Sequence, residues 1–206
     1  MWCLPPCRAS WPSAVADALQ PAVFLDRDGT MIHEVNYLAR REDLRWFSWT
    51  KDAIRLLNRA GYLVFVVTNQ SGVGLGYYPE QFVVDTHAYM AAELERSGAR
   101  VDGWFHCPHH PRATVAGLRL ECTCRKPGRG MIDQAASAHD IDLARSFVVG
   151  DKHLDVALAA TCGGRGILVR TGHGEDELAR MGNVMPGAAF VAAELMEATS
   201  WILRAG

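Results

Sequence analysis

The chain has 206 residues, of which 49% are hydrophobic and 21% are charged, a balance typical of a globular domain with a buried core. Its 21 basic and 23 acidic residues give a net charge of -2, so no nucleic-acid partner is expected. The apolar run at 62–67 is much shorter than the roughly 20 residues needed to cross a bilayer, so no membrane partner is expected either.

The predicted elements alternate between strand and helix. Prolines discourage regular structure near the N-terminus, so residues 1–20 are expected to form an arm and residues 21–206 a single domain. Strands are predicted at 22–26, 62–67, 104–107, 147–150, 166–169 and 189–191, and helices at 50–60, 79–97, 129–139, 153–161 and 193–204. This order predicts an α/β fold, a Rossmann-like parallel sheet with helices on both faces and no large cap domain.

Polar residues gather at the ends of the predicted strands, where ligands of parallel sheets bind. The first strand ends in Asp26 and Asp28, and the fourth ends in Asp151. Thr68 brings a hydroxyl, and Lys126, at the start of a predicted helix, brings a charge that suits a phosphate. Three carboxylates at one point repel each other unless a cation separates them, and oxygen ligands beside a phosphate fit Mg²⁺. The sequence therefore predicts a magnesium and phosphate site.

This motif order, DxDGT, then Thr or Ser, then Lys, then an acidic motif, resembles the haloacid dehalogenase superfamily of phosphatases. The resemblance implies that Asp26 attacks phosphorus to form an aspartyl-phosphate and that Asp28 acts as general acid and base. It implies that Thr68 and Lys126 hold the phosphoryl oxygens. Mg²⁺ would then be held by Asp26, the backbone carbonyl of Asp28, and Asp151. Asp155, one helical turn after Asp151, is expected to cap the helix predicted at 153–161.

Two close pairs of metal-binding residues follow the third predicted strand: Cys107 with His109, and Cys122 with Cys124. Three thiolates and an imidazole suit a closed tetrahedral Zn²⁺ site with a structural role. His110 is the competing imidazole, and buried cysteines beside a surface histidine are the alternative without metal. A zinc ion would order the loop 107–124 and position Lys126 behind it.

The cysteine loop narrows the resemblance from the superfamily to one family within it. The chain is similar to the bacterial D-glycero-D-manno-heptose 1,7-bisphosphate 7-phosphatases in the segments FLDRDGT (24–30), VTNQSG (67–72), CPHHP (107–111), CRKP (124–127), VGDK (149–152) and LVRTG (168–172). The resemblance implies a small-molecule sugar phosphate substrate, with Arg125 suited to its second phosphate. The substrate-binding residues would be Asp26, Arg27, Asp28, Glu34, Val35, Asn36, Tyr37, Thr68, Asn69, Gln70, Ser71, Arg125, Lys126 and Lys152.

Three alternatives stay open. The related histidinol-phosphate phosphatases typically have Asp where this chain has Ser71, and that serine, with the doubled His109-His110, favours the heptose branch. Another small phosphomonoester, including a 3′-phosphorylated oligonucleotide, is the second alternative. A zinc-stabilised binding module with a vestigial site is the third, and the presence of all five candidate active-site groups counts against it.

The cysteines cluster instead of spreading as a disulfide framework would, and no secretory signal accompanies them. We therefore expect a cytoplasmic protein with reduced thiols. Because no large insertion supplies a cap, we also expect an open site and a monomer.

Overall fold

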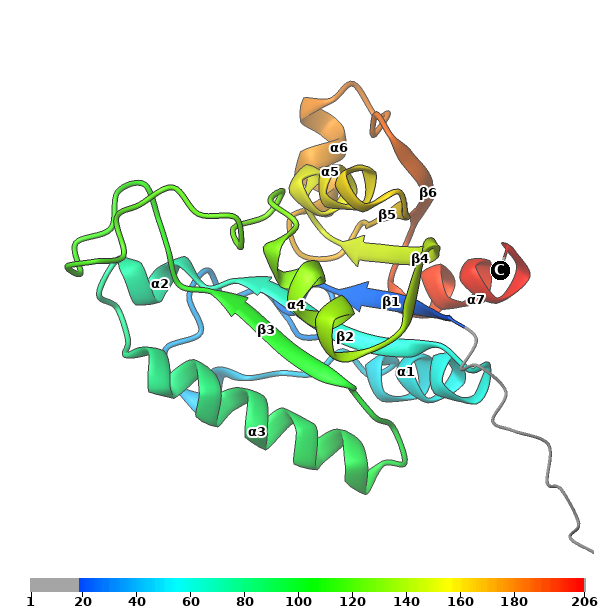
Figure 1. Cartoon of the computed structure of the whole chain (residues 1–206), viewed down its shortest axis with the longest axis horizontal. Coiled ribbons are helices and arrows are strands. Elements are labelled where there is room, and N and C mark those ends of the chain that lie inside the picture. The colour runs from blue at the N-terminus through cyan, green and yellow to red at the C-terminus, as the bar shows by residue number, and fades with distance from the viewer. Residues whose placement is uncertain (1–18, 206) are drawn as a thin grey trace, which may run out of the picture.

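A computed structural model describes residues 19–205 of the chain (Figure 1). The predicted arm, residues 1–20, lies outside the described residues except for its last two. Of these, Gln20 is already the first residue of β1.

Six parallel strands form one sheet in the order β3-β2-β1-β4-β5-β6. The strands are β1 (Gln20–Leu25), β2 (Leu63–Asn69), β3 (Gly103–Cys107), β4 (Ile141–Gly150), β5 (Arg165–Val169) and β6 (Ala188–Ala192). The first strand, β1, lies in the middle of the sheet. The strands β2 and β3 extend one side of it, and the chain then crosses to build the other side from β4. Ligands of such sheets bind where this winding reverses, beyond the carboxyl ends of the central strands.

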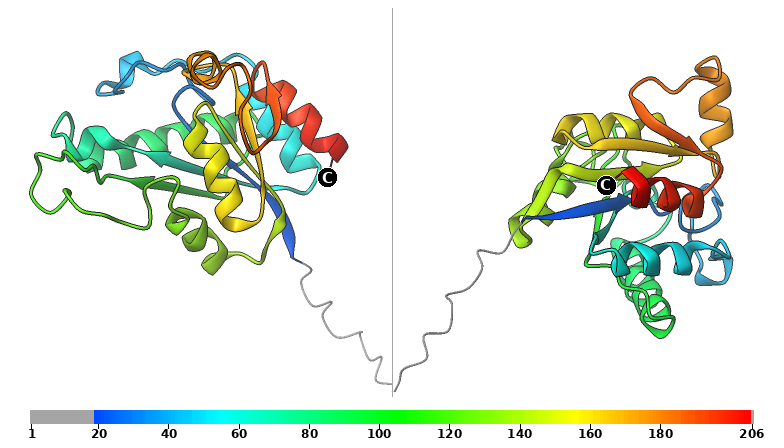
Figure 2. Two further views of the ribbon diagram at one scale, coloured as in Figure 1. Left: turned by 90° about the horizontal axis from the view of Figure 1, so that it is seen from above. Right: turned by 90° about the vertical axis from the view of Figure 1, so that its right-hand side faces the viewer.

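Helices cover both faces of the sheet, as predicted. They are α1 (Thr50–Arg59), α2 (Ser71–Gly74), α3 (Glu80–Arg96), α4 (Gly130–Ala138), α5 (His153–Cys162), α6 (Gly174–Arg180) and α7 (Leu195–Ala205), with one 3-10 turn, η1 (Arg41–Asp43). The left view of Figure 2 shows α1 and α7 on one side of the sheet and α4 and α5 on the other. Among the described residues, no helix is long and apolar enough to cross a membrane.

The core explains why the central strands are continuous apolar runs. Along β1, Val23 and Leu25 belong to the cluster beneath α1, α3 and α7, whereas Phe24 belongs to the cluster beneath α4 and α5. Successive side chains of a strand point to opposite faces, so a strand covered on both faces needs apolar residues at every position. This packing fixes the position at which β1 ends and the polar loop begins.

Candidate active site

A pocket of about 280 Å³ lies beyond the carboxyl ends of β1, β2 and β4. Twelve of the predicted substrate-binding residues line it, namely Asp26, Asp28, Glu34, Asn36, Tyr37, Thr68, Asn69, Gln70, Ser71, Arg125, Lys126 and Lys152. The lining also includes residues that the sequence did not mark as binding: Leu38, Tyr78, Leu154, Asp155 and His173. The remaining two predicted contacts, Arg27 and Val35, do not line the pocket.

Lys126 lies buried between two carboxylates. Its Nζ is 2.6 Å from Oδ1 of Asp26 and 2.6 Å from Oδ1 of Asp155, and it donates to the carbonyl oxygen of Val67 at 2.9 Å. Burial by itself would lower the pKa of Lys126, but the carboxylates of Asp155 and Asp26 outweigh burial and raise it. Lys126 therefore stays positively charged beside the candidate nucleophile.

Asp155 combines two roles, of which the sequence predicted one. Its Oδ2 accepts a hydrogen bond from the backbone N–H of Lys152 at 3.1 Å, so it caps α5 as predicted. Its contact with Lys126 was not predicted, because that contact depends on how the loop before α4 folds across the start of α5.

A group of buried carboxylates marks a candidate cation site. One oxygen from each of Asp26, Asp151 and Asp155 lies within 4.8 Å of the others. Oδ2 of Asp151 accepts from the backbone N–H of His173 at 2.8 Å, whereas its buried Oδ1 has no hydrogen-bond partner among the described residues. Burial, followed by the carboxylate of Asp26, raises the pKa of Asp151 to about 8. A divalent cation fits this arrangement because it would bind the oxygen that accepts no hydrogen bond and would offset the clustered charge.

Two glycines make room for Asp151. Both have positive φ, 84° at Gly29 and 58° at Gly172, where a side chain is strained. A Cβ on Gly29 would lie 2.2 Å from Oδ2 of Asp151, and one on Gly172 would lie 2.3 Å from it. The glycine of the DxDG motif is therefore needed both for its turn and for the space that it leaves to the carboxylate.

The Gln70 side chain sets the orientation of two neighbours. Its Nε2 donates to Oδ2 of Asp28 and to Oγ1 of Thr68, both at 2.9 Å. Its Oε1 accepts from Arg27 at 3.0 Å and from the hydroxyl of Tyr78 at 3.1 Å. Since Thr68 accepts this bond, its own hydroxyl proton is free to donate into the pocket.

The Arg27 side chain lies behind the pocket, not in it. It is 1% exposed, and its guanidinium binds the Asp28 carboxylate, with the shortest contact at 2.8 Å. Its Nη1 is 3.3 Å from Nε2 of His87, a residue of α3. The predicted substrate contact of Arg27 therefore does not involve its side chain. The alternation of side chains after β1 could have indicated this, because Asp26 and Asp28 share one side and Arg27 takes the other.

The segment that follows β1 forms one wall of the pocket. Oε2 of Glu34 lies 3.7 Å from Nζ of Lys152 and 3.4 Å from Nε2 of His173. Val35, by contrast, is 38% exposed and lies outside the lining. In this segment Val35 is therefore the residue that points away from the pocket, between lining residues on both sides.

Hydrogen bonds tie the lysine loop to the end of β2 and to the start of α2. Oδ1 of Asn69 accepts from the backbone N–H of Lys126 at 3.0 Å. Nη1 of Arg125 donates to Oγ of Ser71 at 2.9 Å and to the carbonyl oxygen of His109 at 3.0 Å. Arg125 also borders a second recess of about 770 Å³ beside the cysteine loop. Its guanidinium is thus held at the boundary between the two recesses.

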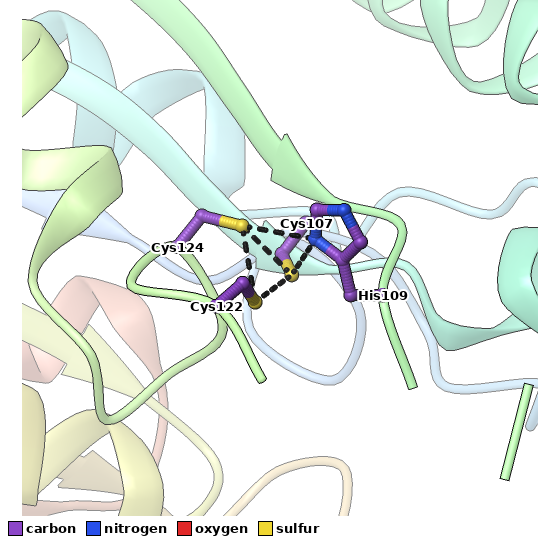
Figure 3. Close-up of side chains that lie close together, drawn as sticks. All are labelled: Cys107, His109, Cys122 and Cys124. Atoms are coloured by element: carbon purple, nitrogen blue, oxygen red, sulfur yellow. Dashed lines mark hydrogen bonds between the residues drawn. The ribbon is translucent and has the colours of Figure 1, made fainter. Parts of the chain in front are cut away.

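The four predicted zinc ligands converge from the two ends of the long loop between β3 and α4 (Figure 3). Sulfur–sulfur distances run from 3.1 Å (Cys107 to Cys124) to 3.6 Å (Cys107 to Cys122), and Nδ1 of His109 is 3.3 Å from Sγ of Cys124. A tetrahedral ion with bonds of roughly 2.3 Å separates its ligands by about 3.8 Å, so small shifts would seat one. His110 is not in this group: its Nδ1 accepts from the backbone N–H of Arg112.

The chain is similar in sequence and in fold to known phosphatases. The family described as polynucleotide kinase 3 phosphatase matches residues 22–153, and the HAD-hydrolase-like family matches residues 123–198. The chain is 46% identical to the D-glycero-beta-D-manno-heptose-1,7-bisphosphate 7-phosphatase of Rhodopseudomonas palustris, over 70% of this chain and 80% of the relative. It is 40% identical to the D-glycero-alpha-D-manno-heptose-1,7-bisphosphate 7-phosphatase of Photorhabdus laumondii, over 75% of this chain and 85% of the relative.

A solved structure agrees with these relatives. The crystal structure of D,D-heptose 1,7-bisphosphate phosphatase from B. bronchiseptica, complexed with magnesium and phosphate, superposes with a TM-score of 0.79 at 32% identity. The match covers 90% of this chain and 99% of that one. The predicted α/β fold is confirmed.

Proposed function

Because the chain belongs to the family of D-glycero-D-manno-heptose-1,7-bisphosphate 7-phosphatases, we propose that it hydrolyses the C7 phosphate of this sugar bisphosphate with Mg²⁺ as cofactor. The observation that carries the proposal is that three distant segments of the chain meet at Asp26: Lys126 contacts it inside the pocket, and a carboxylate oxygen of the buried Asp151, just behind the lining, lies within 4.8 Å of it. An anionic nucleophile beside a fixed cation and a second acid is the arrangement that phosphoryl transfer needs.

Asp26 is the nucleophile. Its carboxylate attacks phosphorus in line with the bond to the sugar oxygen, forms an aspartyl-phosphate and releases the sugar alkoxide. Asp26, Asp151 and the backbone carbonyl of Asp28 would hold the magnesium ion, which supplies charge neutralisation between the carboxylates and the phosphate. Oδ1 of Asp151 supports this ligand set, because it accepts no hydrogen bond among the described residues and its nearest cation, Nζ of Lys152, is 3.9 Å away.

Lys126 and Thr68 bind the non-bridging oxygens of the transferring group. Lys126 keeps its charge because the buried Asp155 remains its partner even when Asp26 becomes phosphorylated. Thr68 can donate its hydroxyl proton because its oxygen already accepts from Gln70. Both groups act as charge shifts onto these oxygens in the transition state.

Asp28 acts first as general acid and then as general base. It protonates the departing sugar alkoxide, a poor leaving group, and then removes a proton from the water that hydrolyses the aspartyl-phosphate. General acid and base help of this kind contributes about 10²–10⁴-fold in rate.

The rest of the substrate is bound at the rim of the pocket. Glu34, Asn36 and Tyr37 line one wall, and Lys152 lies beside Glu34. Arg125 binds the second, non-reacting phosphate, because its guanidinium lies at the pocket's edge and its planar fork suits phosphate oxygens. Contacts to a remote phosphate favour the bisphosphate over smaller phosphoesters.

Cys107, His109, Cys122 and Cys124 would hold a structural zinc ion, which would stabilise the cysteine loop. The donor set leaves no open coordination position, so the ion supplies order and not chemistry. Burial raises the pKa of the Cys107 thiol, so zinc would displace a proton that this sulfur otherwise keeps. Three reduced thiols suit the cytoplasm, where we expect the enzyme to work as a monomer.

A substrate panel tests the proposed function. We would compare kcat/KM for both anomers of the heptose 1,7-bisphosphate, for histidinol phosphate and for a 3′-phosphorylated oligonucleotide, with and without Mg²⁺. We expect the highest kcat/KM for the heptose bisphosphate, and we expect activity to be lost when Mg²⁺ is removed. A preference for another substrate would reassign the reaction. Failure to hydrolyse even p-nitrophenyl phosphate would favour a binding module with a vestigial site.

A further inference from the structure

A buried chain of hydrogen bonds leads from the carboxylate of Asp28 to helix α3. Both Nε and Nη2 of Arg27 lie within 3.3 Å of the Asp28 carboxylate oxygens, which forms a two-nitrogen fork. Nη2 also donates to Gln70, and Nη1 contacts His87. A buried guanidinium is tolerated only when its donors are paired, and each partner of Arg27 fixes one edge of the group.

His87 is the far end of this chain. Its ring is 5% exposed and packs against Trp104 of β3, with the ring centroids 5.0 Å apart. Arginine can only donate hydrogen bonds, so Nε2 of His87 must accept from it, and the ring is neutral with its proton on Nδ1. Burial, followed by the charge of Arg27, lowers the pKa of His87 to about 2, in keeping with this neutral form.

We propose that Arg27 and His87 are positioning residues that hold the Asp28 carboxylate at the angle from which it serves the leaving group and the water. This inference rests on the proposed phosphatase reaction. Asp28 itself is 17% exposed and faces the pocket, so without the fork a single hydrogen bond from Gln70 would hold its carboxylate, and one bond does not fix the angle as a two-nitrogen fork does. His87 acts one step further back, by fixing the plane of the guanidinium.

The role predicts a dependence on the leaving group that a purely structural role would not produce. Nitrophenolate leaves phosphorus without a proton, whereas a sugar alkoxide needs one from Asp28. The ratio kcat/KM reports the reaction only up to departure of the leaving group. In a variant with a misoriented Asp28 carboxylate, kcat/KM should therefore fall for an alkyl phosphate and change little for p-nitrophenyl phosphate.

The experiment uses the full chain with Mg²⁺ and compares two variants at His87. His87→Leu removes the acceptor for Arg27, and we expect kcat/KM for the heptose bisphosphate to fall by about 10–100-fold, the scale on which misplacing a catalytic group acts. The loss on p-nitrophenyl phosphate should stay within about threefold, because that reaction needs no general acid. His87→Gln places an amide oxygen where Nε2 lies and should recover most of the lost rate.

A neighbour on the same helix provides the matched control. Thr86 is fully buried, and its Oγ1 has no hydrogen-bond partner among the described residues, so Thr86→Val should leave both rates unchanged. Equal losses on the two substrates, or no recovery in His87→Gln, would overturn the positioning role. If the heptose bisphosphate is not a substrate, the proposed function fails by itself, and the comparison is run with the best alkyl phosphate in the panel.

Discussion

The catalytic pocket and the cysteine loop lie side by side but are stabilised differently. Asp26 comes directly after β1, and its backbone N–H still donates to the carbonyl oxygen of Val149, so the sheet holds it in place. The segment 108–129, which contains most of the cysteine loop, has no helix or strand, and the close contact of the four candidate ligands joins the two ends of the loop 107–124.

This contrast shows how one pocket can draw on both kinds of support. A loop of this length without regular structure needs something else to order it. Arg125 and Lys126 follow directly after Cys124, so the side chains proposed to bind phosphate belong to the loop, whereas the proposed nucleophile is positioned by the sheet. The following predictions separate the two contributions.

Replacing the proposed nucleophile should stop the reaction and leave both the pocket and the loop folded. In Asp26→Asn, we expect phosphate release to fall by roughly 10⁴-fold or more, because loss of a nucleophile removes the covalent route. Lys126 keeps Asp155 as a partner, so the fold should persist. Turnover assays beside thermal melts check this, and retained turnover would remove the nucleophile assignment.

Removing a zinc ligand should disorder the cysteine loop and leave the sheet folded. Cys124→Ser should reduce the zinc content from about one ion per chain and lower kcat/KM by roughly 100-fold, as losing the residues that orient a site commonly does. Metal analysis, limited proteolysis of residues 108–121 and thermal melts follow the change. Cys162→Ser is the matched control, because this half-buried thiol lies on α5, outside the group of ligands. A fully folded, zinc-free wild-type protein would contradict the argument.

Arg125 lies where the cysteine loop meets the pocket, so replacing it tests what the loop contributes to substrate binding. In Arg125→Ala, we expect KM for the 1,7-bisphosphate to rise about tenfold, since a charged hydrogen bond contributes roughly 1.5 kcal/mol. KM for the 7-monophosphate should change little, because it lacks the second phosphate. Steady-state kinetics on both substrates decides, and an equal rise in both would place Arg125 on the reacting phosphate or in a structural role.

Val35 supplies the baseline. It lies outside the pocket lining, so Val35→Ala should change kcat/KM by less than about twofold, the usual range for an exposed side chain. A much larger loss would indicate that the 34–37 segment closes over the substrate and that Val35 contacts it.

The parallel sheet and the positions of its strands could be predicted from the sequence, because a strand buried on both faces is a continuous apolar run. The order of the strands in the sheet was not predicted. The short helices α2 and α6 were missed. Helix α2 has four residues, two of them glycine, and Val73 packs it into a small cluster with Tyr78 and Val83. Such a helix depends on tertiary contacts and not on its own pattern. Strand β4 begins six residues before its predicted start, at Ile141, where it pairs with Gln20.

The types of residue at the site could also be predicted, but not their partners. The motif spacing places Asp26, Thr68, Lys126 and Asp151 at one sheet edge. It carries no information on the distance from Lys126 to Asp155, which depends on two loops far apart in the sequence. Neither could the sequence show that Arg27 faces α3, since His87 lies sixty residues further along the chain.

The closeness of Gly29 and Gly172 to Asp151 has a practical use. Any methyl group at either position would occupy the space of a carboxylate oxygen, so no substitution there is conservative. When related genomes are screened, a chain with a larger residue at either position can be flagged as a pseudoenzyme candidate before it is cloned.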